Sequence, residues 1–192
     1  MDMRVTVHEV GPRDGLQNET VVLPLEAKLA FIESLVASGL TDIEVTSFVK
    51  PRWVPQLADA VELVKRLPDA PGVTWWALVP NRVGMERALE AGIPAIATFM
   101  SSSETHNKKN INRTIRESLA AQREVIATAV AEGLQVRAYL STVFGCPYEG
   151  DVDPERVVDL SQSLLDAGAQ TISLGDTTGM ANPKQVRELL GR

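Results

Sequence analysis

Arg13 and Asp14 stand next to each other in a short turn and offer the clearest chemistry in the sequence. The turn reads Gly-Pro-Arg-Asp-Gly-Leu-Gln-Asn-Glu over residues 11–19 and follows an apolar run, residues 5–10, that predicts a strand. Adjacent residues do not share a helix face, so this is not an ordinary helical ion pair. Two bracketing glycines would let the turn direct both side chains at one spot, which suits a divalent cation on the carboxylate and an anionic oxygen on the guanidinium. The alternative is a polar turn with a local ion pair.

Two further carboxylates, Glu44 and Asp176, lie at or near the ends of predicted strands. Carboxylates that converge need a cation or a proton between them, because like charges at short range cannot all stay ionised. Oxygen donors of this type suit Mg²⁺ or Mn²⁺. The alternatives are structural: Glu44 as a buried acid paired with Arg13 or Arg137, and Asp176 as an N-cap or Asx-turn residue.

Candidate ligands for a substrate come from three more places in the chain. Arg137 and Tyr139 are two apart in a predicted strand and therefore point to one side of the sheet, either inward as carboxylate ligands or outward over helices. Ser103 lies in a polar run, residues 101–110, predicted as a long loop whose lysines either meet an anionic substrate or are solvated. Thr177 lies at the end of the last predicted strand.

The histidines and the cysteine are weaker candidates. His8 and His106 form no His-x-His or His-x₃-His pair, so the sequence lacks a histidine metal cluster, and without a G-x-S-x-G elbow a serine triad has no support. Cys146 is the single cysteine, which excludes an internal disulfide. With no paired base in its sequence neighbourhood, an inert thiol is favoured over a nucleophile.

Short β-branched runs alternate with helical stretches and supply the elements that would position these residues. Strands are predicted at residues 5–10, 42–46, 73–79, 95–99, 135–140 and 171–174, and helices at 25–38, 55–67, 83–91, 113–131 and 154–167, with another from Pro183. Asn112 and Asp153 are the expected N-caps of two helices. Helix ends are expected at Gly39, Gly92, Gly133 and Gly168.

The alternation predicts an α/β fold with parallel strands joined by helical crossovers. No G-x-G-x-x-G or P-loop is present, and polar residues collect at the carboxyl ends of nearly every strand, which favours a (β/α)8 TIM barrel over a doubly wound sheet. Residues 1–192 are therefore expected to form a single domain with about the first six βα units of a barrel. Because eight units take about 250 residues, we expect a fragment of a longer protein, an open sheet, or a sheet closed by a partner chain.

Composition restricts the partners. The 192 residues are 44% hydrophobic with a net charge of −6 at pH 7, and no basic stripe appears, which argues against nucleic acid and less strongly against a membrane surface. The N-terminus has neither an apolar signal core nor an Arg- and Ser-rich transit peptide, and no run reaches the length of a membrane span. The expected location is the cytoplasm.

These motifs together resemble a known family. Residues 10–19 are similar to the opening motif of the 3-hydroxy-3-methylglutaryl-CoA lyases, which belong to the barrel metallolyases together with isopropylmalate, homocitrate and citramalate synthases. The resemblance extends along the whole chain through Ile-Glu-Val-Thr-Ser-Phe-Val at 43–49, Trp-Val-Pro-Gln at 53–56, Lys-Lys-Asn-Ile-Asn at 108–112, Gly-Cys-Pro-Tyr-Glu-Gly at 145–150 and Ile-Ser-Leu-Gly-Asp-Thr at 172–177. The synthases usually read Leu-Arg-Asp-Gly at the first motif, so the turn favours the lyase branch.

The resemblance implies a metal-dependent cleavage of 3-hydroxy-3-methylglutaryl-CoA to acetyl-CoA and acetoacetate, as in leucine degradation. It implies Asp14 as a ligand of Mg²⁺ or Mn²⁺, Arg13 as the group that stabilises the enolate oxygen of the departing acetyl-CoA, and Gln17 as a substrate-positioning residue. Glu44 and Asp176 would be acid/base groups or would lie behind the metal ligands. The implied partner is an acyl-CoA, and a eukaryotic source would imply the mitochondrial matrix.

The sequence also departs from the family pattern. The family's His-x-His metal ligands, its late Asn ligand and its catalytic Cys on a Gly-rich loop have no counterpart in residues 1–192, and Cys146 matches an earlier family segment. The isolated chain is therefore expected to be inactive. The alternatives are a Claisen-type synthase that condenses acetyl-CoA with a 2-oxo acid, and a non-catalytic barrel fragment held by oligomeric or partner contacts, a homo-oligomer among them.

Overall fold

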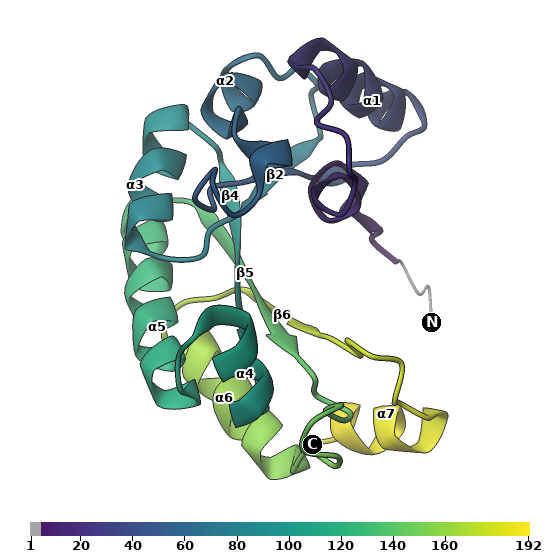
Figure 1. Ribbon diagram of the computed structural model, residues 1–192, viewed down its shortest axis with the longest axis vertical. Coiled ribbons are helices and arrows are strands. Elements are labelled where there is room, and N and C mark those ends of the chain that lie inside the picture. Colours follow the sequence, from purple (N-terminus) through teal and green to yellow (C-terminus); the bar gives the residue numbers. More distant parts are fainter. Residues whose placement is uncertain (1–4) are drawn as a thin grey trace. The chain divides into compact units, whose positions relative to one another are not determined.

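The structure is a computed structural model that describes residues 5–192, and it alternates strands with helices throughout (Figure 1). The strands are β1 (His8–Glu9), β2 (Asp42–Ser47), β3 (Thr74–Leu78), β4 (Ala95–Ser101), β5 (Gln135–Ser141) and β6 (Thr171–Leu174). The helices are α1 (Leu25–Ala37), α2 (Ala60–Lys65), α3 (Arg82–Ala91), α4 (Glu104–Ile111), α5 (Ile115–Ala131), α6 (Pro154–Asp166) and α7 (Pro183–Leu190). A π-helical turn, η1 (Gly11–Gly15), follows β1, and a 3₁₀ turn, η2 (Pro55–Leu57), precedes α2. The predicted α/β class is confirmed.

The chain divides into two compact units, Met1–Ile96 and Ala97–Arg192. In the first unit β1 pairs with β2 and β2 with β3, all parallel, and a register shift between Glu44 and Thr46 interrupts the second pairing. Ile43 and Val45 of β2 are fully buried, and so is the polar Glu44 between them. A parallel strand covered on both faces is normally apolar, so a buried carboxylate in this strand points to a specific partner.

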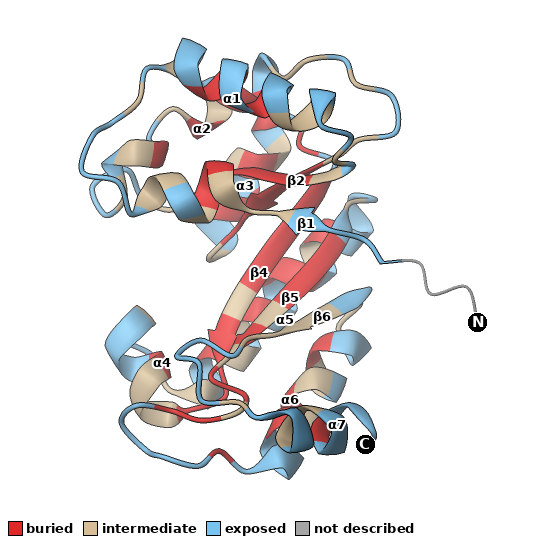
Figure 2. Ribbon diagram, turned by 90° about the vertical axis from the view of Figure 1, so that its right-hand side faces the viewer, coloured by how far each residue is buried: buried red, intermediate tan, exposed pale blue. Residues whose placement is uncertain are grey.

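In the second unit β5 pairs in parallel with β6, and the strand order is β4-β5-β6. The helices α5 and α6 supply buried apolar side chains, among them Val125, Ile126 and Leu164. Figure 2 shows β4 almost entirely buried and β5 buried over its middle, whereas β6 is only partly covered. The carboxyl ends of these strands lead into the segments that hold the polar residues singled out in the sequence.

Most helix boundaries follow the expected signals. Asp153 caps α6 by accepting from the Glu155 N–H at 3.0 Å, and Pro154 occupies the first turn. The backbone has positive φ at each predicted glycine stop, Gly39, Gly92, Gly133 and Gly168. No helix within residues 5–192 is long and apolar enough to cross a membrane.

Two expectations about the segment after β4 are wrong. The polar run 101–110 is not a long loop, because α4 forms within it, capped by the Ser103 hydroxyl, which accepts from the His106 N–H. Asn112 is not the N-cap of α5 but ends α4 in the left-handed conformation with φ 54°. Asparagine tolerates that conformation. The true N-cap is Thr114, which forms a reciprocal capping box with Glu117.

Two other elements are shorter than predicted. The first strand contains only His8 and Glu9, because Val5 and Val7 are exposed and unpaired in the described sheet. The predicted helix 55–67 divides into η2 and α2, with Asp59 between them. The shortened helix leaves the Asp59 carboxylate available to a buried lysine described below.

Candidate active site

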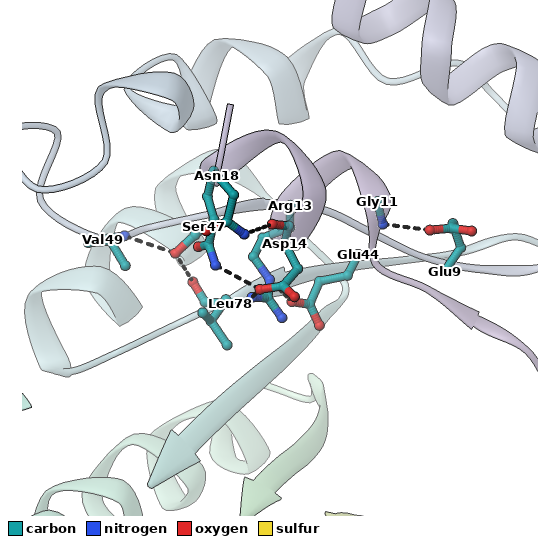
Figure 3. A network of polar contacts seen from close by, with 10 residues as sticks. Glu9, Gly11, Arg13, Asp14, Asn18, Glu44, Ser47, Val49 and Leu78 are labelled. Atoms are coloured by element: carbon teal, nitrogen blue, oxygen red, sulfur yellow. Dashed lines mark hydrogen bonds and ion pairs between the residues drawn. The ribbon is translucent and has the colours of Figure 1, made fainter. Parts of the chain in front are cut away.

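The η1 turn places Arg13 between two carboxylates (Figure 3). The Asp14 N–H bonds to the Val10 carbonyl at 2.6 Å, which folds the chain back directly after β1. The Arg13 side chain is buried, with the whole residue 9% exposed, and its Nε donates to the Glu44 carboxylate on β2. Its Nη1 donates to Asp14 Oδ1 at 2.5 Å. The guanidinium is therefore held in one orientation by a fully buried acid on one side and a partly exposed acid on the other.

The turn also fixes the Asp14 carboxylate. Oδ1 accepts from Gln17 Nε2 at 2.7 Å in addition to Arg13, and Asn18 Nδ2 donates to the Asp14 backbone carbonyl at 2.7 Å. The Asp14 side chain is nevertheless 50% exposed. The structure thus brings together four of the predicted site residues: Arg13, Asp14, Gln17 and Glu44.

Glu9 is a contributor that the sequence reasoning missed. Its Oε1 accepts from the Gly11 N–H at 2.5 Å and so fixes the start of the turn. A Cβ at Gly11 would lie 2.8 Å from Glu9 Oε1 and 3.5 Å from the Phe31 ring, so a larger residue there would displace the Glu9 carboxylate from this bond. The available signal was a carboxylate two residues before the motif, at the end of the predicted strand.

Asp14 fits a divalent cation as a single ligand. A half-exposed carboxylate oriented by two donors is a suitable oxygen ligand for Mg²⁺ or Mn²⁺. Within residues 5–192, no group of three or more His, Cys, Asp or Glu side chains is arranged to hold a metal ion. Among the described residues, Asp14 is therefore a candidate for one metal ligand and not part of a preformed cluster of such side chains.

In the second unit, Arg137 and Tyr139 lie on one side of β5, as their spacing predicts. The guanidinium carbon of Arg137 is 5.3 Å from the centre of the Tyr139 ring. Arg137 is only 1% exposed, and Tyr139 is half-buried. The two side chains form a cation–π pair at a partly desolvated position, where such contacts are stronger than at the surface.

A cluster of hydroxyl groups joins the carboxyl ends of β4, β5 and β6. Ser101 Oγ lies 2.7 Å from Thr142 Oγ1, and the Thr142 N–H donates to Thr177 Oγ1 at 2.8 Å. Thr142 has φ 59°, which is rare for a β-branched residue. Because the exposed Thr177 hydroxyl accepts this bond, its own proton is directed elsewhere. From the sequence, Thr177 was predicted as a substrate ligand, whereas Thr142 was recognised only as a polar residue at a strand end.

Ser103 and Cys146 form a buried contact rather than an open nucleophile. Ser103 Oγ donates to Cys146 Sγ at 2.9 Å, and both residues are buried. Antiparallel bonds of 2.7 and 2.8 Å join Cys146 to Gly150 and close the tight loop that holds the thiol. This environment agrees with the interpretation of Cys146 as an inert thiol.

The same loop anchors the start of α4. Glu149 Oε1 accepts from the Thr105 N–H at 2.6 Å, and hydrogen bonding from Thr105 lowers the pKa of Glu149 below its ordinary value. Lys109 Nζ lies 3.7 Å from the centre of the Tyr148 ring. The His106 ring packs near Tyr148, with 6.4 Å between centroids, and burial lowers the pKa of His106.

Asp176 organises the segment that leads into α7. Its Oδ1 accepts from the N–H groups of Met180 and Ala181, at 2.9 and 3.2 Å. The N-cap of α7 is Asn182, which forms a capping box with Gln185. Asp176 therefore has a structural role in this loop, but the expectation that it is an N-cap is wrong, because Asn182 caps the helix.

Comparison with known proteins gives a consistent result. A family model described as HMGL-like matches residues 4–192. Hydroxymethylglutaryl-CoA lyase YngG of Bacillus subtilis is 53% identical over 97% of this chain and 62% of its own length. A rat 3-hydroxy-3-methylglutaryl-CoA lyase, named as cytoplasmic, is 46% identical over 97% of this chain and 54% of its own. The chain thus spans less than two thirds of the length of these relatives.

Solved structures agree with the sequence comparisons. The crystal structure of the B. subtilis HMG-CoA lyase has a TM-score of 0.94 and 53% identity, covering 98% of this chain and 63% of that one. An HMG-CoA lyase from Acinetobacter baumannii, in complex with coenzyme A and 3-methylmalate, has a TM-score of 0.91 and 36% identity, covering 96% of this chain and 60% of that one. The predicted fold, an α/β chain with about six βα units of a TIM barrel, is confirmed by these likenesses.

Proposed function

The chain belongs to the HMGL-like family, and from that premise we propose that it carries part of the catalytic machinery of a hydroxymethylglutaryl-CoA lyase. The proposed reaction cleaves 3-hydroxy-3-methylglutaryl-CoA to acetyl-CoA and acetoacetate. Relatives named for this activity and a neighbour that holds coenzyme A with 3-methylmalate support it. The observation that carries the proposal is the placement of Arg13 between Glu44 and Asp14.

The reaction needs a positive group where enolate charge develops. The C3 hydroxyl loses its proton and becomes the ketone of acetoacetate, the C2–C3 bond breaks, and its electron pair moves to the acetyl-CoA enolate, which then takes a proton at C2. A prearranged donor at the enolate oxygen stabilises this transition state. Arg13 is suited to that role because Glu44 and Asp14 already fix its guanidinium. Glu44, which is fully buried, would act through Arg13 as a positioning residue.

Asp14 is the proposed ligand of the Mg²⁺ or Mn²⁺ ion. When bound, such an ion would polarise the substrate oxygens next to the bond that breaks. Asp14 would hold it with its partly exposed carboxylate, and Gln17 would keep that carboxylate in one orientation by its 2.7 Å bond to Oδ1. Gln17 thereby positions the substrate indirectly.

The proposed roles in the second unit follow from donor geometry. The exposed Thr177 hydroxyl accepts from the Thr142 backbone and is proposed to donate its proton to a substrate oxygen. Arg137 with Tyr139, within β5, and Ser103, at the start of α4, are proposed to bind the acyl-CoA, supported by their polar character. Asp176 is proposed to support them by fixing the segment before α7.

The wider assignment rests on the family. We propose a role in leucine degradation and a cytoplasmic location, the latter supported by the name of the rat relative. Residues 1–192 are proposed to be one domain that forms the first part of a TIM barrel, supported by the likeness to the B. subtilis structure. A homo-oligomer is compatible with this assignment.

The test is acetoacetate release from 3-hydroxy-3-methylglutaryl-CoA by the natural polypeptide that contains residues 1–192, assayed with Mg²⁺ and with Mn²⁺. Arg13→Lys keeps the charge but loses the planar fork, so kcat should fall by roughly 100-fold or more. Arg82→Lys is the matched control, because Arg82 is exposed and makes only a loose pair with Glu86 at 3.8 Å. No acetoacetate release, or consumption of acetyl-CoA with a 2-oxo acid instead, would contradict the proposal.

A further inference from the structure

We propose that Lys28 positions the turn that carries Arg13 and Asp14. It would act through Gln56, which bonds both to Lys28 and to Glu19 at the end of that turn. The proposal concerns positioning residues, none of which would touch the substrate. Its consequence for activity rests on the proposed function, whereas its structural part can be tested without any activity.

The first link is a buried ammonium group with every donor used. Lys28 lies on α1 and is 2% exposed. Its Nζ donates to both carboxylate oxygens of Asp59, at 2.7 and 2.8 Å, and to the Gln56 backbone carbonyl at 2.5 Å. A lysine has three N–H donors, so this charge is fully satisfied. If Lys28 served only to pack α1, an apolar side chain would do so at a lower desolvation cost. We therefore assign the lysine the role of holding the Gln56 carbonyl in place.

Gln56 connects that buried group to the turn. The residue lies in η2, where the neighbouring Leu57 is buried and fixes the segment. Its backbone carbonyl accepts from Lys28, and its side-chain Nε2 donates to the Glu19 carbonyl at 2.7 Å. Glu19 is the last residue of the Gly11–Glu19 motif. Gln56 therefore links the buried Lys28 ammonium group to the last residue of the turn.

Hydrogen bonds within the short turn connect Glu19 to Asp14, so fixing Glu19 also restricts Asp14. The Glu19 N–H bonds to the Leu16 carbonyl at 3.2 Å, and Asn18 Nδ2 bonds to the Asp14 carbonyl at 2.7 Å. The start of the turn is fixed separately, where the Gly11 N–H donates to Glu9. With both ends held, the Asp14 carboxylate has a defined direction, and release of the Glu19 end would let it vary.

The first experiment measures amide hydrogen exchange of residues 14–19 in the natural polypeptide. Gln56→Ala should speed exchange there by about fivefold, the loss expected from one neutral hydrogen bond, while exchange in β2 and β3 stays unchanged. Gln162→Ala is the matched control, because Gln162 also donates through its amide, to Asp166 at 2.7 Å in the second unit. Unchanged exchange at residues 14–19 in Gln56→Ala would overturn the proposal, whatever the activity.

A second variant separates positioning from simple loss of stability. Replacing both charges, Lys28→Met with Asp59→Asn, removes the buried ion pair without leaving one charge alone, which is often tolerated. If the double variant keeps its denaturation midpoint, exchange at residues 14–19 should still rise, because the Gln56 carbonyl is released. Unchanged exchange in a stable double variant would show that Lys28 serves only packing and would overturn its role.

The activity measurement links the network to the reaction. In an active natural polypeptide, Gln56→Ala should lower kcat by about fivefold with little change in KM, since the carboxylate is misdirected while substrate contacts persist. An unchanged kcat together with faster exchange would overturn positioning of the site. If the wild-type polypeptide releases no acetoacetate, the proposed function fails, and the exchange data alone decide whether Lys28 holds the turn.

Discussion

At the scale of single residues, the structure shows which partner Glu44 has, whereas its influence on catalysis stays a prediction. The sequence left Glu44 either as a catalytic acid or as a buried partner of Arg13 or Arg137. The structure has Glu44 fully buried and bonded to Arg13. An influence of Glu44 on the proposed chemistry would therefore pass through the orientation of the guanidinium, because the carboxylate itself does not face solvent.

Arg13→Met should destabilise the protein more strongly than an ordinary surface change. The variant leaves the buried Glu44 carboxylate without its Arg13 partner, and breaking a buried ion pair from one side costs on the order of 3 kcal/mol. The double variant Arg13→Met with Glu44→Gln should recover much of that loss, because no buried charge is then left unbalanced. Urea denaturation of the single and double variants measures both terms, and equal stabilities would show that the pair is energetically unimportant.

At Thr142, replacement by glycine should destabilise the protein less than replacement by alanine. At φ 59° the residue is in the left-handed region, where a side chain with a Cβ costs about 1–2 kcal/mol. Thr142→Gly and Thr142→Ala both lose the hydroxyl that contacts Ser101, but only glycine relieves the backbone. Thr142→Gly should therefore be more stable than Thr142→Ala by about 1 kcal/mol, the reverse of the usual helix and strand preference. An alanine variant of equal or higher thermal stability would refute the strain.

At the scale of elements, the strands and long helices were predictable because their apolar patterns were strong. The helix α4 was missed because it has no apolar stripe: its one buried residue, Asn107, is polar and is held by bonds to Ser101 and Ser118. Asn112 was misassigned because asparagine suits both an N-cap and a left-handed helix end. Such choices depend on tertiary contacts, and a local pattern does not contain them.

In the candidate site, contacts between residues close in sequence could be predicted, whereas contacts between distant residues could not. Arg13, Asp14 and Gln17 are close in sequence, so one turn could be expected to gather them, and a strand spacing of two placed Arg137 beside Tyr139. The supporting bonds of Gln56 to Glu19 and of Lys28 to Asp59 span 37 and 31 positions. No local spacing rule indicates pairs so far apart.

The α4 helix should give the protein a dependence on pH through His106. Burial lowers the pKa of His106 from its ordinary value of 6.5, and its Nδ1 is buried without a hydrogen-bond partner among residues 5–192. As the pH falls below about 6.5, the unfolded chain binds the proton first, so stability declines until the folded-state pKa is passed. His106→Phe keeps a ring beside Tyr148 and should remove this decline. Denaturation midpoints between pH 7 and 5 measure it, and parallel curves for both proteins would contradict the assignment.

At the scale of the whole molecule, the two compact units carry separate natural probes. All three tryptophans, Trp53, Trp75 and Trp76, belong to Met1–Ile96, and the single Cys146 belongs to Ala97–Arg192. Trp75 and Trp76 are buried in β3, and the Cys146 thiol is buried beside Ser103. Tryptophan fluorescence therefore follows the first unit, and thiol labelling follows the second.

These probes should report one cooperative transition. The strand β4 begins with Ala95 and Ile96 in the first unit and continues through 97–101 in the second, and six of its seven residues are buried. Unfolding of either unit would end this strand in its middle, which favours joint unfolding. Fluorescence and thiol labelling across a urea series should therefore give coincident midpoints. A thiol that becomes reactive well before the fluorescence changes would mean that the units unfold independently, and residues 1–192 would then behave as two folding units and not as the single domain proposed for them.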